Sequence, residues 1–212
     1  MSQTKPMIRR GRKFEQVPEG ARTIFLRDGF EGASVDDIAA AAGVSKATLY
    51  SYFPDKRLLF LEAAKSECTR QANEAVSLVT TFAGAPEMLR YVGGRIVEFI
   101  SSDFGMAMFR IGVAEAQRFP EIGHDFYHSG PMLLRARLGD YLREYVARGE
   151  LRIEDVDLAS DQFAELCKAD IHARLIFGVT AGVSARDARR IVEGAVEMFM
   201  ARYGTGAPAT EG

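Results

Sequence analysis

Hydrophobic residues recur at helical spacing along most of this chain, and no segment shows the alternation that is typical of a strand. Glycines, prolines and capping residues divide the pattern into segments. These segments predict an all-α protein of about nine helices, with no internal repeat. The expected helices cover approximately residues 17–29, 34–42, 45–53, 55–78, 86–100, 104–118, 132–148, 155–177 and 184–203, with a short segment from 120 to 128.

Two helix starts are open to more than one interpretation. Proline is tolerated in the first turn of a helix but disrupts an interior turn. Because Pro18 follows Val17, the first helix is expected to begin near Val17 or to kink there. Either Asp155 or Asp157 is expected to open the helix that precedes residue 177.

The local pattern is clearest between residues 34 and 53. Ser34 and Ser45 are typical N-caps, and Asp37 follows Ser34 at the spacing of a capping box. Gly43 supplies a turn between two short helices. Their apolar positions form one inward face, which comprises Val35, Ile38, Ala39, Ala42, Val44, Leu49 and Phe53. This pattern predicts a helix-turn-helix, whose second helix can enter the major groove of DNA.

Polar and aromatic side chains around the second helix are candidate DNA contacts. Lys46 can donate to guanine O6 and N7 or to a phosphate, and Ala47 can approach a thymine methyl group. Hydroxyl groups and helix N-termini are suited to phosphate oxygens. The candidates are Ser34, Lys46, Ala47, Thr48, Tyr50, Tyr52 and Lys56. The competing interpretation is an ordinary helical hairpin whose tyrosines serve only for packing.

The charge distribution also favours a DNA-binding head. Residues 1–60 hold ten Lys and Arg against seven Asp and Glu, whereas the remainder holds seventeen against twenty-two. Within the first thirteen residues five basic side chains occur without an acid, namely Lys5, Arg9, Arg10, Arg12 and Lys13. A basic head on an acidic body indicates a polyanionic partner, although a solvated terminus would have the same composition.

Composition indicates the broad class. The chain has 212 residues, of which 47% are hydrophobic and 26% charged, as expected for one large or two small globular domains. No apolar run is long enough to cross a bilayer, and none follows the basic N-terminus as in a secretory signal. Cys68 and Cys167 lie far apart without a partner motif, which indicates free thiols in a reducing compartment. We therefore expect a cytoplasmic protein.

Residues 14–61 resemble the N-terminal domain of the TetR family of transcriptional regulators. The matching positions are Phe30, Ser34, Val35, Ile38, Ala39, Ala42, Gly43, Val44, Ser45, Thr48, Leu49, Tyr50, Tyr52, Phe53, Lys56 and Leu59. The resemblance implies a three-helix DNA-binding head on a larger helical body that dimerises and binds a small effector. It implies base contacts by Lys46 and Ala47, and phosphate contacts by Thr48, Tyr50, Tyr52 and Lys56. Pro18 and Gly20 depart from the pattern, because the family usually has good helix formers there.

A second set of residues resembles the C-terminal region of the AefR-like branch of the same family. It comprises Phe109, Arg110, Glu115, Phe119, Pro120, Glu121, Phe126, Tyr127, Gly130, Pro131, Gly149, Glu150 and Leu151. The expected organisation is a flexible basic arm at 1–13, a helix-turn-helix domain at 14–56, an effector-binding and dimerisation domain at 57–204, and a flexible tail at 205–212.

The body is expected to form a homodimer. A single helix-turn-helix contacts too little DNA for tight specific binding, so two copies on a two-fold operator are expected. Apolar positions of the last two helices are the candidate dimer surface, namely Phe163, Leu166, Ile171, Leu175, Ile191, Ala195, Met198 and Phe199. The alternative is that these side chains only close the core of one chain.

Methionines and aromatic residues of the middle helices are candidates for an effector pocket, since such side chains adapt to irregular apolar ligands. The expected lining is Met88, Tyr91, Phe104, Met106, Phe109, Arg110, Phe126 and Phe163. Arg110 and Glu115 require a partner or a polar ligand if they are buried.

Three other classes of function compete with this interpretation. His124 and His128 are spaced i, i+4 and could bind a metal with Asp125 or His172. Either cysteine could sense oxidants, and the helices could serve as a protein-binding adaptor. The chain has no HExxH motif, cysteine cluster or phosphate-binding glycine loop. We therefore predict no enzymatic activity and no cofactor, but a repressor released from its operator by an unknown small molecule.

Overall fold

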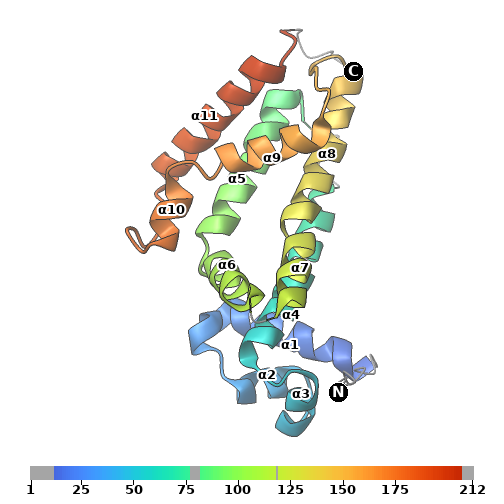
Figure 1. The fold of residues 1–212 in the computed structure, drawn as a ribbon, viewed down its shortest axis with the longest axis vertical. Coiled ribbons are helices and arrows are strands. Elements are labelled where there is room, and N and C mark those ends of the chain that lie inside the picture. Colours follow the sequence, from blue (N-terminus) through green and yellow to red (C-terminus); the bar gives the residue numbers. More distant parts are fainter. Residues whose placement is uncertain (1–11, 77–81, 118, 207–212) are drawn as a thin grey trace.

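The structure is a computed structural model that describes residues 12–76, 82–117 and 119–206, and it confirms the predicted all-α fold. Figure 1 shows an elongated molecule in which α4 leads from a small head to a larger body. The head contains α1 (Arg12–Gly32), α2 (Val35–Ala41) and α3 (Lys46–Tyr52), followed by α4 (Lys56–Val76). The body contains α5 (Ala85–Ser101), α6 (Asp103–Ala116), α7 (Pro120–Ser129), α8 (Pro131–Ala147), α9 (Val156–Leu166), α10 (Ile171–Ile176) and α11 (Ala185–Tyr203). None of the described helices is long and apolar enough to span a bilayer.

The first helix begins earlier than predicted. α1 starts at Arg12 and includes Pro18, so a start near Val17 is wrong. Val17 and Pro18 are both buried, and their packing offsets the hydrogen bond that proline cannot donate. The helical backbone is interrupted instead at Gly29, which has a φ of 71°. Residues 1–11, which hold most of the expected basic arm, lie outside the described residues.

The head has its own hydrophobic core. It is built from Phe25 of α1, Ile38 of α2, Leu49 of α3 and Phe60 of α4. The ring of Phe60 lies 4.9 Å from that of Phe25 and 5.2 Å from that of Phe104 in α6. Apolar packing therefore continues from the head into α6 of the body.

Gly20 permits a close approach between α1 and the helix-turn-helix. A Cβ atom at this position would lie 2.6 Å from the backbone nitrogen of Ala42 and 2.8 Å from its Cβ. Atoms cannot be packed this closely, so the helices would have to separate. The departure from a helix-forming residue at Gly20 is thus explained by the contact with the turn.

A second hydrophobic core fills the outer part of the body. Its largest fully buried side chains include Tyr145 of α8, Phe163 of α9 and Phe199 of α11. α11 packs along α5, and α9 packs along α8. The two cores share no residue. The apolar interior is therefore discontinuous between the level of α6 and that of α9.

The body contains more helices than predicted. The segment after Phe119 forms α7, and the single helix expected at 155–177 is divided into α9 and α10. Asp155 is the N-cap of α9, because its carboxylate accepts a hydrogen bond from the backbone N–H of Leu158 at 2.9 Å. The division occurs before Asp170, whose φ of 69° is incompatible with a continuous helix.

The beginning of the expected flexible tail is attached to the body. Gly204 forms an isolated antiparallel bridge with Leu151. The backbone N–H of Thr205 donates to the carbonyl of Glu150 at 3.1 Å, and its hydroxyl donates to that of Gly149 at 2.8 Å. Residues 207–212 lie outside the described residues.

Replacement of Gly20 by alanine is expected to lower the free energy of unfolding by about 1–3 kcal/mol, because the added methyl group overlaps Ala42. The matched control is Gly94→Ala in α5, where no atom lies within 4 Å of the new Cβ. That change should leave stability unaltered or raise it by up to about 1 kcal/mol. Urea denaturation followed by circular dichroism measures both, and equal effects would contradict the proposed contact.

Candidate DNA interface

The two helices of the helix-turn-helix are each capped by a serine. Ser34 accepts a hydrogen bond from the backbone N–H of Asp37 at 3.0 Å and donates its hydroxyl to the Asp37 carboxylate at 2.7 Å. Ser45 accepts from the backbone N–H of Thr48 at 3.1 Å. Gly43 makes the turn between them with a φ of 64°. The predicted caps and turn are thus present, and they fix the direction of α3.

One face of α3 is open to solvent. Lys46, Ala47 and Tyr50 are exposed, and Thr48 is half-buried with its hydroxyl 2.8 Å from that of Ser45. Leu49 on the opposite face is buried in the head core. In Figure 1, α3 lies at the end of the molecule that is farthest from α11. The structure therefore brings these four predicted residues together on an accessible surface.

Tyr52 and Lys56 lie at the edge of this surface and are partly engaged in the head. The ring of Tyr52 is half-buried and meets Phe14 of α1 edge-on, with ring centroids 5.6 Å apart. The amino group of Lys56 lies 4.8 Å from the centroid of the Phe30 ring and donates to the carbonyl of Glu31 at 3.4 Å. Both residues therefore also stabilise the head.

Asp36 is a residue of this surface that the sequence interpretation missed. Its carboxylate oxygens lie 3.0 and 3.1 Å from the amino group of Lys46. The hydrogen bond from Lys46 to Asp36 raises the pKa of the lysine above its ordinary value. The spacing of ten residues across the turn gave no local signal of this pair, since only the crossing of α2 and α3 brings the side chains together.

An ion pair joins the head to the body. Arg57, in the first turn of α4, contacts Asp55 at 2.5 Å and also forms a short ion pair with Glu115 of α6. Hydrogen bonding to Asp55 holds the pKa of Arg57 above its usual range. Glu115 is only 5% exposed. The expectation that Glu115 requires a partner is met by a cation from the head.

Arg110 lies five residues before Glu115 on α6 and contacts α10 of the body. Its guanidinium donates to the carbonyl of Leu175 at 2.9 Å and to that of Ile176 at 3.3 Å. These carbonyls belong to the last turn of α10, where a cation is favourable. Arg110 is therefore engaged with the backbone of the body and does not pair with Glu115.

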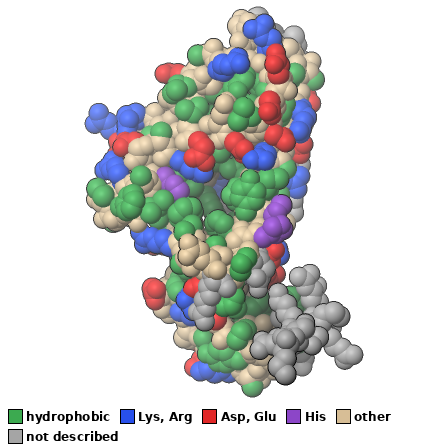
Figure 2. Space-filling view, viewed as in Figure 1, with side chains coloured by type: hydrophobic (Ala, Val, Ile, Leu, Met, Phe, Trp, Pro, Cys, Tyr) green, Lys and Arg blue, Asp and Glu red, His purple; other side chains and the backbone are tan. Residues whose placement is uncertain are grey.

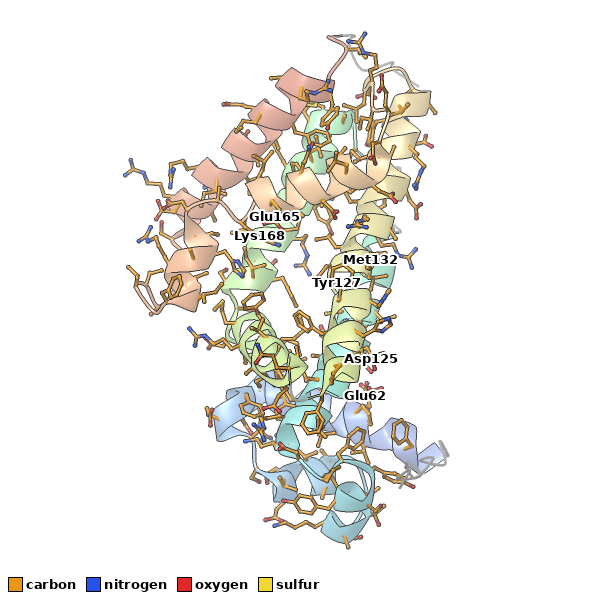
Figure 3. All side chains as sticks on the ribbon, in the orientation of Figure 1. Glu62, Asp125, Tyr127, Met132, Glu165 and Lys168 are labelled. Carbon is orange, nitrogen blue, oxygen red and sulfur yellow. The ribbon has the colours of Figure 1, made fainter. Side chains whose placement is uncertain are left out.

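A hollow separates two sides of the body. Figure 2 shows it between the side formed by α6, α9 and α10 and the side formed by α7 and α8, with hydrophobic side chains around it. Figure 3 shows Glu165 of α9 and Lys168, which follows α9, on one side, opposite Tyr127 of α7 and Met132 of α8. The hollow lies where the two hydrophobic cores fail to meet.

Several residues expected to line an effector pocket are committed to these cores. Met88 and Phe163 are fully buried in the body core, and Phe104 packs against Phe60. Met106 is also buried, whereas Tyr91 is half-buried and packs against Phe82. Core packing makes Met88, Phe104 and Phe163 inaccessible to a ligand without rearrangement, because their side chains are already surrounded.

Two other expected lining residues lie closer to the middle of the body. The ring of Phe109 meets that of His172 edge-on at 4.9 Å, which joins α6 to α10. Phe126 of α7 packs against Gly112 of α6, where a Cβ would lie 2.9 Å from its ring. Burial holds the pKa of His172 below its ordinary value, so a neutral imidazole is favoured there.

Most of the residues expected at a dimer surface are unavailable to a partner. Phe163, Ile171, Leu175, Ile191, Ala195 and Phe199 are buried within the single chain. Leu166 is half-buried against the body core, and Met198 is 63% exposed. The periodic pattern identified the inner face of each helix, but that face packs on α5 and α8 of the same chain. Within the expected set, Met198 and part of Leu166 are therefore the residues that remain open to a partner.

The competing metal and redox interpretations receive little support from the geometry. The rings of His124 and His128 lie 4.1 Å apart, but within the described ranges no three His, Cys, Asp or Glu side chains gather into a metal site. Burial raises the pKa of Cys68 to about 11 and that of Cys167 to about 12. Both thiols are thus held in the unreactive protonated form at neutral pH.

A capped helix-turn-helix with an open polar face, carried on a larger helical body, defines the class of DNA-binding transcriptional regulators. Residues 19–63 match the model of bacterial regulatory proteins of the tetR family, and residues 87–205 match that of the AefR-like transcriptional repressor C-terminal domain. The chain belongs to the TetR family.

Individual relatives agree with this assignment. The chain is 40% identical over 63 residues to the HTH-type transcriptional repressor AcnR of Corynebacterium efficiens, a match that covers 30% of this chain and 33% of AcnR. The chain thus spans about a third of the length of that relative. A TetR-family transcriptional regulator from Mesorhizobium loti MAFF303099 has a TM-score of 0.75 at 26% identity, with 92% of this chain and 98% of that chain covered.

A further solved structure is similar over nearly the whole chain. The Flavonoid-responsive Regulator FrrA is 32% identical, with a TM-score of 0.64 and coverage of 93% of this chain and 100% of FrrA. The similarity therefore extends through the body as well as the head.

Proposed function

We propose that this protein is a cytoplasmic, non-enzymatic repressor that binds a two-fold operator in double-stranded DNA. The observation that carries the proposal is the exposed face of α3, which presents Lys46, Ala47 and Tyr50 on a capped helix. Lys46 and Ala47 are suited to base edges, and the hydroxyls of Thr48 and Tyr50 to phosphates. Ser34, Tyr52 and Lys56 extend the phosphate-binding surface from the ends of the neighbouring helices.

The operator can be isolated by selecting fragments of the source genome that the protein retains, and affinities can then be measured by gel-shift titration at fixed salt. Lys46→Ala should weaken operator binding by about 1–3 kcal/mol and relax the sequence preference at one position. Tyr50→Phe should weaken binding to all sequences equally, because a phosphate contact carries no sequence information.

The matched control is Tyr127→Phe in the body, since Tyr127 is 45% exposed and Tyr50 is 43% exposed. This change should leave DNA affinity unaltered in the absence of effector. Unchanged operator binding by both α3 variants would refute the assignment of this helix.

We also propose that two copies associate through the outer face of α11 and the segment before it. Phe177 and Val179, between α10 and α11, are 80% and 72% exposed, and Met198 is 63% exposed. Large apolar side chains exposed to this degree favour a protein interface. The outer face of α11 carries Arg186 and Arg189 in its first half and Glu197 in its second half. A two-fold pairing of antiparallel α11 helices would bring these opposite charges together.

Met198→Glu should weaken the dimer at least about tenfold, because a carboxylate would replace a large apolar side chain in the proposed contact. Sedimentation equilibrium measures the dimerisation constant. Val113→Glu is the matched control, since Val113 is 56% exposed on α6, away from the proposed interface. If the two variants dimerise equally well, the interface lies elsewhere.

The effector is proposed to be an aromatic polyhydroxy compound that occupies the hollow of the body. Support comes from the mixed lining of Tyr127, Met132 and Lys168, which combines apolar surface with polar groups. FrrA, with 32% identity over most of the chain, is described as flavonoid-responsive. Ligand binding beside α6 would reach the head through the Glu115–Arg57 ion pair, and would lower operator affinity only if the ligand prefers one arrangement of that contact.

Quercetin, a flavonoid, is expected to bind the free protein in isothermal titration calorimetry and to release it from the operator. Met132→Trp should lower the affinity for quercetin at least about tenfold by filling the hollow. Leu26→Trp is the control, because Leu26 is 45% exposed on α1 in the head. Equal affinities of both variants for quercetin would exclude the hollow as its binding site. If quercetin released the operator without binding to the protein, this class of effector would be excluded.

A further inference from the structure

An acidic side chain stands on the surface that faces DNA in the proposed function. Asp36 lies in the first turn of α2, and its side chain is 73% exposed. The neighbouring Asp37 is occupied by the Ser34 cap, whereas Asp36 reaches across the turn to Lys46. Asp36 is therefore the carboxylate that contacts a predicted base-reading residue.

Stability does not account for this pair. An exposed ion pair contributes little to folding, because solvent screens its charges and both side chains lose freedom. A carboxylate beside the DNA backbone also lowers affinity by repelling phosphates. The presence of Asp36 at this position is instead consistent with a role in specificity, since repulsive elements discriminate between partners.

The chemistry of lysine shows what the pair can do. Lysine is a point charge on a flexible four-carbon stem, and without a partner it would be attracted to the nearest phosphate of any sequence. Asp36 holds the Lys46 amino group at the N-terminal end of α3, which is the end that meets base edges. The ammonium has three donors, so the pair leaves donors available for guanine O6 and N7.

We propose that Asp36 is a specificity-determining residue that positions Lys46 for base readout and weakens binding to non-operator DNA. This inference rests on the proposed function, because it concerns DNA contacts of α3. Removal of the carboxylate should free Lys46 to bind a phosphate. The protein would then gain affinity for DNA in general and lose discrimination.

The test compares Asp36→Asn with Glu31→Gln. Both changes remove one negative charge from the head, but Glu31 contacts Lys56 only through its backbone carbonyl. Affinities for the selected operator and for a random duplex of equal length are measured over a series of salt concentrations. Thermal unfolding of each variant is followed by circular dichroism.

Asp36→Asn should bind the random duplex more tightly than Glu31→Gln does. The plot of log affinity against log salt should become steeper by about 0.9 on the random duplex, as expected for one additional phosphate contact. The ratio of operator to random affinity should fall at least about fivefold. In a Lys46→Ala background the two charge variants should behave alike, because the side chain to be positioned is absent.

Identical salt slopes and affinity ratios for the two variants would overturn the inference while leaving the DNA-binding function intact. A lower unfolding temperature with equal weakening on both DNAs would also overturn it, because the pair would then only brace α2 against α3. Failure of the unaltered protein to select or bind an operator would refute the proposed function itself.

Discussion

The arrangement of head and body depends on the buried carboxylate of Glu115. A charged group with so little access to water is costly unless a cation compensates it, and Arg57 at the start of α4 supplies that cation. The pair is reinforced by the aromatic contact between Phe60 and Phe104. The head therefore cannot change its angle to α6 without disturbing an ion pair and a packed core, so the two parts of the chain are mechanically connected.

Two side chains of opposite charge anchor α6 at different points along its length. Glu115 engages the head, whereas Arg110 engages the carbonyl groups that end α10. Between α6 and α9 the hydrophobic interior is discontinuous, and the body is hollow there. A molecule in this hollow would contact an element that is already joined to the DNA-binding head. Such a site is well placed for regulation, since a ligand shifts an equilibrium only through contacts that differ between the states.

Local signals predicted the head well because its structure is determined over short distances. The serine caps and Gly43 each act within four residues, and the buried face of α2 and α3 follows directly from the spacing of Ile38 and Leu49. The same reasoning misplaced the start of α1, because burial of Pro18 overrides its effect on helix propensity. It also missed Asp36, whose partner is ten residues away.

The sequence by itself determined the all-α class, the helix-turn-helix and the family, because periodicity, caps and a long motif are local properties of the chain. Only the tertiary structure decided which partner each apolar face meets. Phe163 and Phe199 fit a dimer surface by spacing, yet they close the core of one chain. Periodicity predicts which face of a helix is buried, but it does not identify the element that packs against that face. The structure likewise decided that Glu115 pairs with Arg57, because residues 58 positions apart in the sequence meet only when the head packs against α6.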